Sequence, residues 1–403
     1  KKHSSLPFPL TRMAKVERPR SSARTALSLY IHIPYCSKRC GYCDFNTYTP
    51  QELNSHNLAL ITTPYIDSVL KELELAAERT GGGIVPSIFF GGGTPSLMPA
   101  AEIGRIMKKI TEVFELEKDV EVTLEANPDT LSRAYLDQLV VAGINRISIG
   151  MQSAVPHVLS ALDRTHDPDN VIKACELVRA AGINRLSVDL IYGVPGESIS
   201  DWQKTYQAAL ELPIEHVSAY ALIVEIGTKL AARIKRGELV MPPDDETAEK
   251  YLLFDDATEE RGFNWYELSN WSKEGGACRH NISYWNGSYW WGIGPGAHSY
   301  LNGKRWWNVK HPNTYQSALQ NGDSPEASSE QLTESNLRDE FVMLQIRMRE
   351  GIPLNRLSKE ELNKVEKFRE SGHLEGDSWE AGNLILSRTG RLIADRIVRE
   401  MLM

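Results

Sequence analysis

Three cysteines, Cys36, Cys40 and Cys43, lie within eight residues near the start of the chain. Thiolates are the usual ligands of iron–sulfur clusters, and this tight spacing lets a single loop wrap a cluster. Structural zinc is the alternative, but zinc favours four ligands in two separated pairs, and only His32 is close enough to complete such a set. We predict a four-iron cluster on the three thiolates, with one iron left open for a small molecule.

A second group of candidate residues follows strand-like runs further along the chain. Residues 91–96 are rich in glycine, which lets a backbone approach a ligand without a Cβ in the way, although such a run also suits a plain turn. Glu125 ends the next strand-like run. A helix cap is its alternative role, but Asp129 is better placed for that. Residues 150–153, 189–196 and 220–221 occupy similar positions.

Alternating strand and helix patterns between about Leu27 and Leu222 predict the elements that position these residues. Amphipathic stretches between the strands include Tyr65–Arg79, which stops at Gly81, and Val171–Ala180, where Cys175 is expected in the core. Six strand–helix units in succession indicate an α/β fold with a partial parallel (β/α)6 barrel, whose ligands gather at the carboxyl ends of the strands. The predicted strands are residues 27–33, 87–90, 120–124, 146–149, 185–191 and 216–222.

A short internal repeat fits this barrel. Residues 142–146 and 181–185 both read Ala-Gly-Ile-Asn-Arg and each precedes a predicted strand. A shared helix end followed by a strand start explains the likeness, and so do two successive units of one barrel. The local structure that the repeat predicts is the same in either case.

Beyond the barrel the composition changes twice. Seven of the nine tryptophans lie between Trp265 and Trp307, a density that suits a large flat ligand but is also typical of ordinary cores. From Glu334 onward, helical runs flank a predicted strand pair around Leu374–Ser387, with Gly376 and Gly382 as turn residues, in the order of a small winged-helix-like module. We divide the chain into an N-terminal arm (1–28), the barrel (29–230), an aromatic-rich linking region (231–330) and a C-terminal helical module (331–403).

Composition excludes several classes of function. The net charge of −8 argues against nucleic-acid binding, including by the winged-helix-like module, because phosphate binding favours a basic surface. No apolar run is long enough to span a membrane. The clustered cysteines indicate a reducing compartment, which we take to be the cytoplasm. The basic, Ser-rich arm suits a floppy extension, with an organelle transit peptide as the alternative.

The cysteine spacing, together with Tyr42 just before Cys43, resembles the signature of the radical S-adenosylmethionine (SAM) enzymes. This resemblance implies a radical SAM barrel in which SAM binds the open iron of a [4Fe-4S] cluster and is cleaved to a 5′-deoxyadenosyl radical. It also implies that Arg164 faces the SAM carboxylate, that Asp189 accepts from ribose hydroxyls, and that the glycine run meets the SAM amino group. The SAM contacts that the resemblance implies are Tyr30, Gly92, Gly93, Thr94, Glu125, Gln152, Arg164, Asp189 and Ala221.

Within that superfamily the chain resembles the branch that contains oxygen-independent coproporphyrinogen III oxidase and the HemW heme chaperones. Tyr30–Pro34, Gly91–Ser96, Asp189–Gly196 and the C-terminal module carry this likeness. The oxidase has a further cysteine two residues after the third, where this chain has Phe45, as HemW does. The element His280-Asn281-x-x-Tyr284-Trp285 is similar to the one associated with heme in HemW. His280 is the expected axial ligand of the iron, with Cys278 as a rival and His298 as the other histidine of the segment.

The resemblance therefore implies a heme chaperone that holds a [4Fe-4S] cluster, SAM and heme, receives electrons from a donor and delivers heme to client proteins. An oxidative decarboxylase of the coproporphyrinogen type is the first alternative, and Phe45 counts against it. A radical SAM enzyme with an unrelated substrate is the second. A cluster protein that never cleaves SAM is the third.

Overall fold

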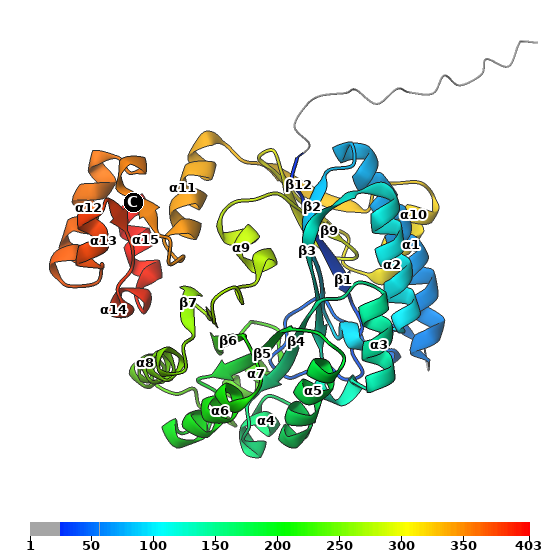
Figure 1. Cartoon of the computed structure of the whole chain (residues 1–403), viewed down its shortest axis with the longest axis horizontal. Helices are drawn as coiled ribbons and strands as arrows, with labels where there is room; N and C mark the ends of the chain where they lie inside the picture. Colours follow the sequence, from blue (N-terminus) through cyan, green and yellow to red (C-terminus); the bar gives the residue numbers. More distant parts are fainter. Residues whose placement is uncertain (1–24, 56) are drawn as a thin grey trace, which may run out of the picture.

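The computed structural model describes residues 25–55 and 57–403, and six neighbouring parallel strands form its centre. These strands follow one another in space in chain order, which confirms the predicted partial barrel. Figure 1 shows them as a curved sheet with helices along its outer face. The strands are β1 (Ser28–Ile33), β2 (Ile84–Gly92), β3 (Glu115–Ala126), β4 (Arg146–Gln152), β5 (Arg185–Tyr192) and β6 (His216–Ala221).

The outer helices connect these strands, and three of them are followed by a glycine in a left-handed turn. Gly81 caps the first helix with φ of 69°, and Gly143 and Gly182 of the internal repeat have φ of 98° and 86° before β4 and β5. The first helix begins at Leu58, earlier than predicted, because the Asn57 side chain caps it by accepting from Ala59 N–H; Pro64 lies within the helix. The helices are α1 (Leu58–Thr80), α2 (Ala100–Val113), α3 (Arg133–Val141), α4 (Pro156–Ala161), α5 (Pro168–Ala180) and α6 (Ile199–Glu211).

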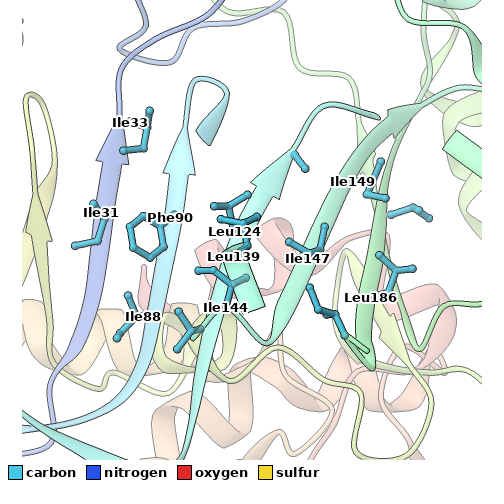
Figure 2. Close-up of a cluster of buried hydrophobic side chains, with 14 of the residues drawn as sticks. Ile31, Ile33, Ile88, Phe90, Leu124, Leu139, Ile144, Ile147, Ile149 and Leu186 are labelled. Carbon is cyan, nitrogen blue, oxygen red and sulfur yellow. The ribbon is translucent and has the colours of Figure 1, made fainter. Parts of the chain in front are cut away.

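Strand alternation separates the hydrophobic core from the inner face of the barrel. Figure 2 shows side chains of β1 to β5, among them Ile31, Phe90 and Ile147, packed with Leu139 and Ile144. The residues between them in sequence point the other way, as expected for period-two strands. These inward residues, which include Tyr30, Phe89, Glu125, Ser148 and Asp189, line a cavity.

The aromatic-rich region, residues 231–330, extends the barrel sheet at both edges. Strand β9 (Trp290–Ile293) pairs in parallel with β1, and β8 (Asn270–Ser272) pairs antiparallel with β6. The sheet thereby reaches twelve strands, although no edge strand was predicted. The remaining elements of this region are α7 (Lys229–Lys235, which begins just before it), α8 (Asp244–Glu260), β7 (Asn264–Glu267), α9 (Arg279–Trp285), β10 (His298–Leu301), β11 (Lys304–Asn308), α10 (Pro312–Gln320) and β12 (Glu326–Gln331).

The C-terminal helical module has a hydrophobic core of its own. Its strand pair joins Ile352–Pro353 to Asn383–Leu384, so the expected hairpin around Leu374–Ser387 is wrong in its partner. Leu374 and Leu386 form only an isolated bridge, because residues 376–380 between them fold as a short helix. The elements are α11 (Glu334–Gln345), β13 (Ile352–Pro353), α12 (Lys359–Glu370), α13 (Gly376–Glu380), β14 (Asn383–Leu384), α14 (Arg388–Arg391) and α15 (Ala394–Leu402).

Two other expectations concern the chain start and membranes. Residues 1–24 of the predicted arm lie outside the described residues, whereas Leu27 and Ser28 are buried in the sheet. In the part of the chain that the structure describes, no helix has the length and apolarity needed to cross a membrane.

Candidate functional site

The three cysteines lie on the loop that follows β1 and open onto one cavity of about 550 Å³. The loop is closed by backbone bonds, since Cys36 N–H donates to Tyr48 O (3.0 Å) and Tyr48 N–H donates to Pro34 O (2.7 Å). All three thiols are free and half-buried. A short segment of closed backbone therefore presents three possible ligands at the carboxyl end of the barrel.

Two donors from other barrel loops approach these sulfur atoms. Thr94 Oγ1 lies 3.7 Å from Cys36 Sγ, and Arg164 Nη1 lies 3.8 Å from Cys40 Sγ. Burial raises the pKa of the Cys36 thiol to about 11 and also raises the pKa of Cys43. Hydroxyl and guanidinium donors stabilise thiolates, so these contacts suit cysteines that are deprotonated when they bind iron.

The described side chains form no ready-made site for a single zinc ion. Within residues 25–55 and 57–403, no three or more His, Cys, Asp or Glu side chains converge to hold a metal ion. Thiols on separate corners of a four-iron cluster stand further apart than thiols around one ion. His32 is also unsuited to zinc, because its Nε2–H donates to Asn46 O (2.9 Å) while Nδ1 accepts from the Tyr30 hydroxyl (3.0 Å).

All nine residues expected to contact SAM line this cavity. In the glycine run, Gly92 N–H donates to Glu125 Oε2 (3.2 Å). A Cβ at Gly92 would lie 2.5 Å from the His32 ring, and one at Gly93 would lie 2.5 Å from Tyr35 O. Close packing against β1 therefore requires glycine at both positions, whether or not a ligand is bound.

Two half-buried carboxyl groups, Glu125 and Asp189, face the cavity from neighbouring parts of the sheet. Burial, reinforced by nearby Asp189, raises the pKa of Glu125 to about 8. Burial also raises the pKa of Asp189, although its carboxylate accepts a hydrogen bond from Ser148 Oγ (2.9 Å). Buried carboxyl groups in a cleft with shifted pKa values are typical of functional sites.

Arg164 and Gln152 lie on the β4 side of the cavity. Arg164 Nη2 donates to Gly150 O (2.8 Å), so its guanidinium bridges the end of β4 and the cysteine loop. Gln152 has φ of 62°, a conformation that non-glycine residues adopt at a cost of roughly 1–3 kcal/mol. Such local strain beside a ligand cavity supports a functional role for this bulge.

Helix α9 brings the expected heme-binding residues to the same cavity from its inner side, and Figure 1 shows this helix within the open curve of the sheet. His280, Asn281 and Tyr284 line the cavity, whereas Trp285 does not. Only 1% of His280 is exposed, and its Nδ1 and Nε2 lie 2.9 Å from Ser87 Oγ and from the Tyr284 hydroxyl. Both ring nitrogens of His280 are thus occupied.

The other expected heme contacts are less favourably placed. Cys278 is buried, lines the cavity, and donates its thiol hydrogen to Glu121 Oε1 at 3.4 Å. His298 is not among the residues that line the cavity and stacks on Trp307. No tryptophan of the described residues lines the cavity, and Trp265, Trp271, Trp291 and Trp306 are core residues. Most aromatic side chains of this segment therefore pack in the core and do not form a wall of the cavity.

Several cavity residues were not identified from the sequence. Phe89 on β2 lines the cavity, and it contacts His280 together with the buried Ser87; their alternation with Ile88 and Phe90 is the signal that would have placed both on the inner face. At the mouth, Ile223 is 71% exposed and Phe45 63% exposed. Two exposed apolar side chains at the rim of a cavity suit an apolar ligand.

Comparison with known proteins agrees with the site and the fold. Residues 30–209 match the model of the radical SAM superfamily. The chain is 43% identical over 393 residues to "Heme chaperone HemW" of Mycobacterium tuberculosis, covering 97% of this chain and 99% of the relative. It is 33% identical to the Bacillus subtilis protein of that name, covering 82% and 86% of the two chains.

Among solved structures, the chain is similar to coproporphyrinogen III oxidase (HemN) from Escherichia coli. The TM-score is 0.79 with 20% identity, over 94% of this chain and 91% of that chain. At this identity the likeness demonstrates a shared fold alone. It extends through the C-terminal helical module as well as the barrel.

Proposed function

This chain belongs to the radical SAM superfamily and to its HemW family, and on that premise we propose that it is a heme chaperone. It holds a [4Fe-4S] cluster in the barrel, binds SAM and heme in the cavity that adjoins the cluster, and delivers heme to client proteins. The observation that carries the proposal is the single cavity lined both by the three cysteines and by His280, Asn281 and Tyr284.

The proposed roles of the barrel residues follow from their contacts. Cys36, Cys40 and Cys43 hold the cluster, which supplies an open iron for SAM and a route for an electron from a donor protein. Arg164, already fixed on Gly150 O, directs its guanidinium toward the cysteine loop and the SAM carboxylate. Thr94 and the glycine backbone border the same ligand, and Asp189 accepts from its ribose.

Heme binding is supported by the shape and rim of the cavity. A volume of about 550 Å³ lies within the range of roughly 300–1,000 Å³ typical of sites for ligands of drug size. Phe45 and Ile223 offer apolar surface at its mouth. Phe45 also stands where the oxidase has its additional cysteine, so we propose that coproporphyrinogen is not decarboxylated here. The three clustered, free thiols favour a reducing compartment such as the cytoplasm.

The test is an anaerobic titration of the reconstituted chain with heme, followed by transfer to a heme-free client protein. A chaperone must hold its cargo and release it, so we expect saturable binding with a Kd near micromolar, roughly −8 kcal/mol. In parallel, coproporphyrinogen III with SAM and a reductant should yield no decarboxylated product. Absence of saturable heme binding, or decarboxylation at useful rates, would overturn the proposal.

A further inference from the structure

In helix α9, a tyrosine hydroxyl and a histidine ring nitrogen are joined by a hydrogen bond. The Tyr284 hydroxyl lies 2.9 Å from His280 Nε2. On the opposite side of the ring, Nδ1 lies 2.9 Å from Ser87 Oγ, whose own hydrogen is donated to Ser28 Oγ at 2.9 Å. Because the Ser87 hydroxyl donates its hydrogen bond to Ser28 Oγ, its oxygen accepts the hydrogen bond from His280 Nδ1–H. The Nε2 lone pair is therefore left to accept the Tyr284 proton.

The two side chains differ in their access to the cavity. His280 is 1% exposed and stacks on Phe89 with ring centroids 5.1 Å apart, so it is covered on several sides. Tyr284 is half-buried, lines the cavity, and places its hydroxyl over His280 Nε2. An iron–nitrogen bond is shorter than this hydrogen bond, so iron cannot reach Nε2 while Tyr284 stays in place. Of these two side chains, the half-buried Tyr284 is the one whose ligand atom iron can bind without displacing the other.

We propose, on the premise that this chain binds heme, that the Tyr284 oxygen is the axial ligand of ferric heme and that His280 is a positioning residue behind it. Tyrosine oxygen is an established protein ligand of heme iron. In the binding step the Tyr284 O–H bond breaks and an Fe–O bond forms, while iron stays ferric and releases any bound water. The proton passes to His280 Nε2, which changes from acceptor to donor in the same hydrogen bond.

Neighbouring rings hold this pair in a fixed orientation. Tyr284 packs edge-on against His280 and against Trp290, with centroid distances of 5.0 Å in both cases. Burial lowers the pKa of His280, so an imidazolium forms there only next to the negative phenolate. The oxygen anion also offsets the extra positive charge of ferric iron, so reduction of the iron should weaken the bond and favour release.

The test compares Tyr284→Phe with His280→Ala and His280→Gln in anaerobically reconstituted full-length protein titrated with ferric heme. Under a tyrosine ligand, Tyr284→Phe removes the phenolate-to-iron charge-transfer band and weakens binding at least tenfold. His280→Ala keeps the band but weakens binding, and His280→Gln, whose amide N–H can donate a hydrogen bond to the phenolate, restores part of the loss. Tyr300→Phe, in the same aromatic segment but outside the residues that line the cavity, is the matched control and should match the parent.

If His280 were the axial ligand, the changes in heme affinity would have the opposite signs. Tyr284→Phe would then free Nε2 and strengthen binding, and both His280 variants would lose the axial ligand; either result overturns the inference while leaving heme binding intact. A parent protein that binds no heme overturns the proposed function instead. Should Tyr284→Phe not fold, parent protein labelled with ring-deuterated tyrosine decides the point, because only a tyrosinate ligand shifts the iron–phenolate bands of the resonance Raman spectrum.

Discussion

The cysteine loop, residues 36–43, and helix α9, Arg279–Trp285, border one cavity but satisfy their polar atoms in different ways. In the loop, the three thiols are half-buried, and two of them make long contacts with Thr94 and Arg164. In α9, both nitrogens of His280 have protein partners and the side chain is 1% exposed. The thiols of the loop are available to bind a metal cluster. In α9, by contrast, His280 must break a hydrogen bond before it can bind iron, or a different atom of the helix must bind it.

This difference predicts the largest effect of any single substitution. Replacing Cys36, Cys40 or Cys43 with Ala should abolish the cluster, because we propose each of the three thiolates as a direct ligand of iron. Iron and sulfide analysis after anaerobic reconstitution should fall from about four of each per chain to near zero. Cys175→Ala is the control, since Cys175 is a core residue of α5 and should leave the iron content unchanged. Equal loss in the control would contradict the assignment.

The shared cavity predicts competition between SAM and heme. The charge of Glu125 raises the pKa of Tyr284, and both Glu125 and Tyr284 raise the pKa of Tyr30. The expected heme and SAM contacts are therefore close neighbours. One cavity of about 550 Å³ suits one ligand of this size class and not two. With SAM at a hundred times its Kd, the apparent Kd of heme should rise about a hundredfold in absorbance titrations. An unchanged heme Kd would place the two ligands at separate sites.

The sequence was sufficient for the barrel because its signals are local. Alternating apolar residues in β1, and glycines with positive φ before β4 and β5, each act within a few neighbours. The edge strands depend on pairing with a sheet formed elsewhere. Strand β12, Glu326–Gln331, has no apolar alternation and is mostly exposed, so only its partner β11 defines it. The C-terminal strand pair was misassigned for the same reason.

The same distinction between local and tertiary signals applies to the candidate site. The cysteine loop is eight residues long, so spacing alone predicted three ligands beside each other. The partner of His280 Nε2, Tyr284, lies in the same helix, but the partner of Nδ1 is Ser87 on β2, 193 residues earlier, and no local pattern relates Ser87 to α9. Counting tryptophans was misleading because their number does not reveal which side of a sheet they face. Access of His280 to a ligand depends on tertiary contacts that its motif does not encode.

A smaller effect is expected from pH, on the loop side of the cavity. Burial, followed by the charge of Asp189, raises the pKa of Glu125 to about 8, so the group is mostly protonated at pH 7. SAM carries a positive sulfonium, which favours the ionised carboxylate. Between pH 7 and pH 9 the ionised fraction rises from about a tenth to about nine tenths, so SAM affinity should increase several-fold. Asp189, whose pKa is also raised, and Arg164 face the same space.

Glu125→Gln is the matched variant for this effect, because it keeps the shape of the side chain and removes its titration. Its SAM affinity, measured from the response of the reduced cluster spectrum, should vary little between pH 7 and pH 9. Arg164→Ala should weaken SAM at every pH and keep the parent slope. A Gln variant with the full pH dependence would move the titrating group to Asp189 or to SAM itself.

The smallest effect is expected for Cys278, the cysteine at the start of α9. It lies two residues before His280, and its spacing alone made it a rival ligand of heme iron. Burial raises the pKa of this thiol to about 12, and the hydrogen on sulfur is donated to Glu121 Oε1 at 3.4 Å. Cys278→Ala should therefore leave the heme spectrum unchanged and lower the free energy of unfolding by about 1–2 kcal/mol, the order expected for a small void and a weak hydrogen bond. Cys175→Ala, at a buried site far from the cavity, should cost a similar amount. An altered ferric heme spectrum in Cys278→Ala alone would make the thiolate a ligand, and α9 would then have to turn its first residues toward the cavity.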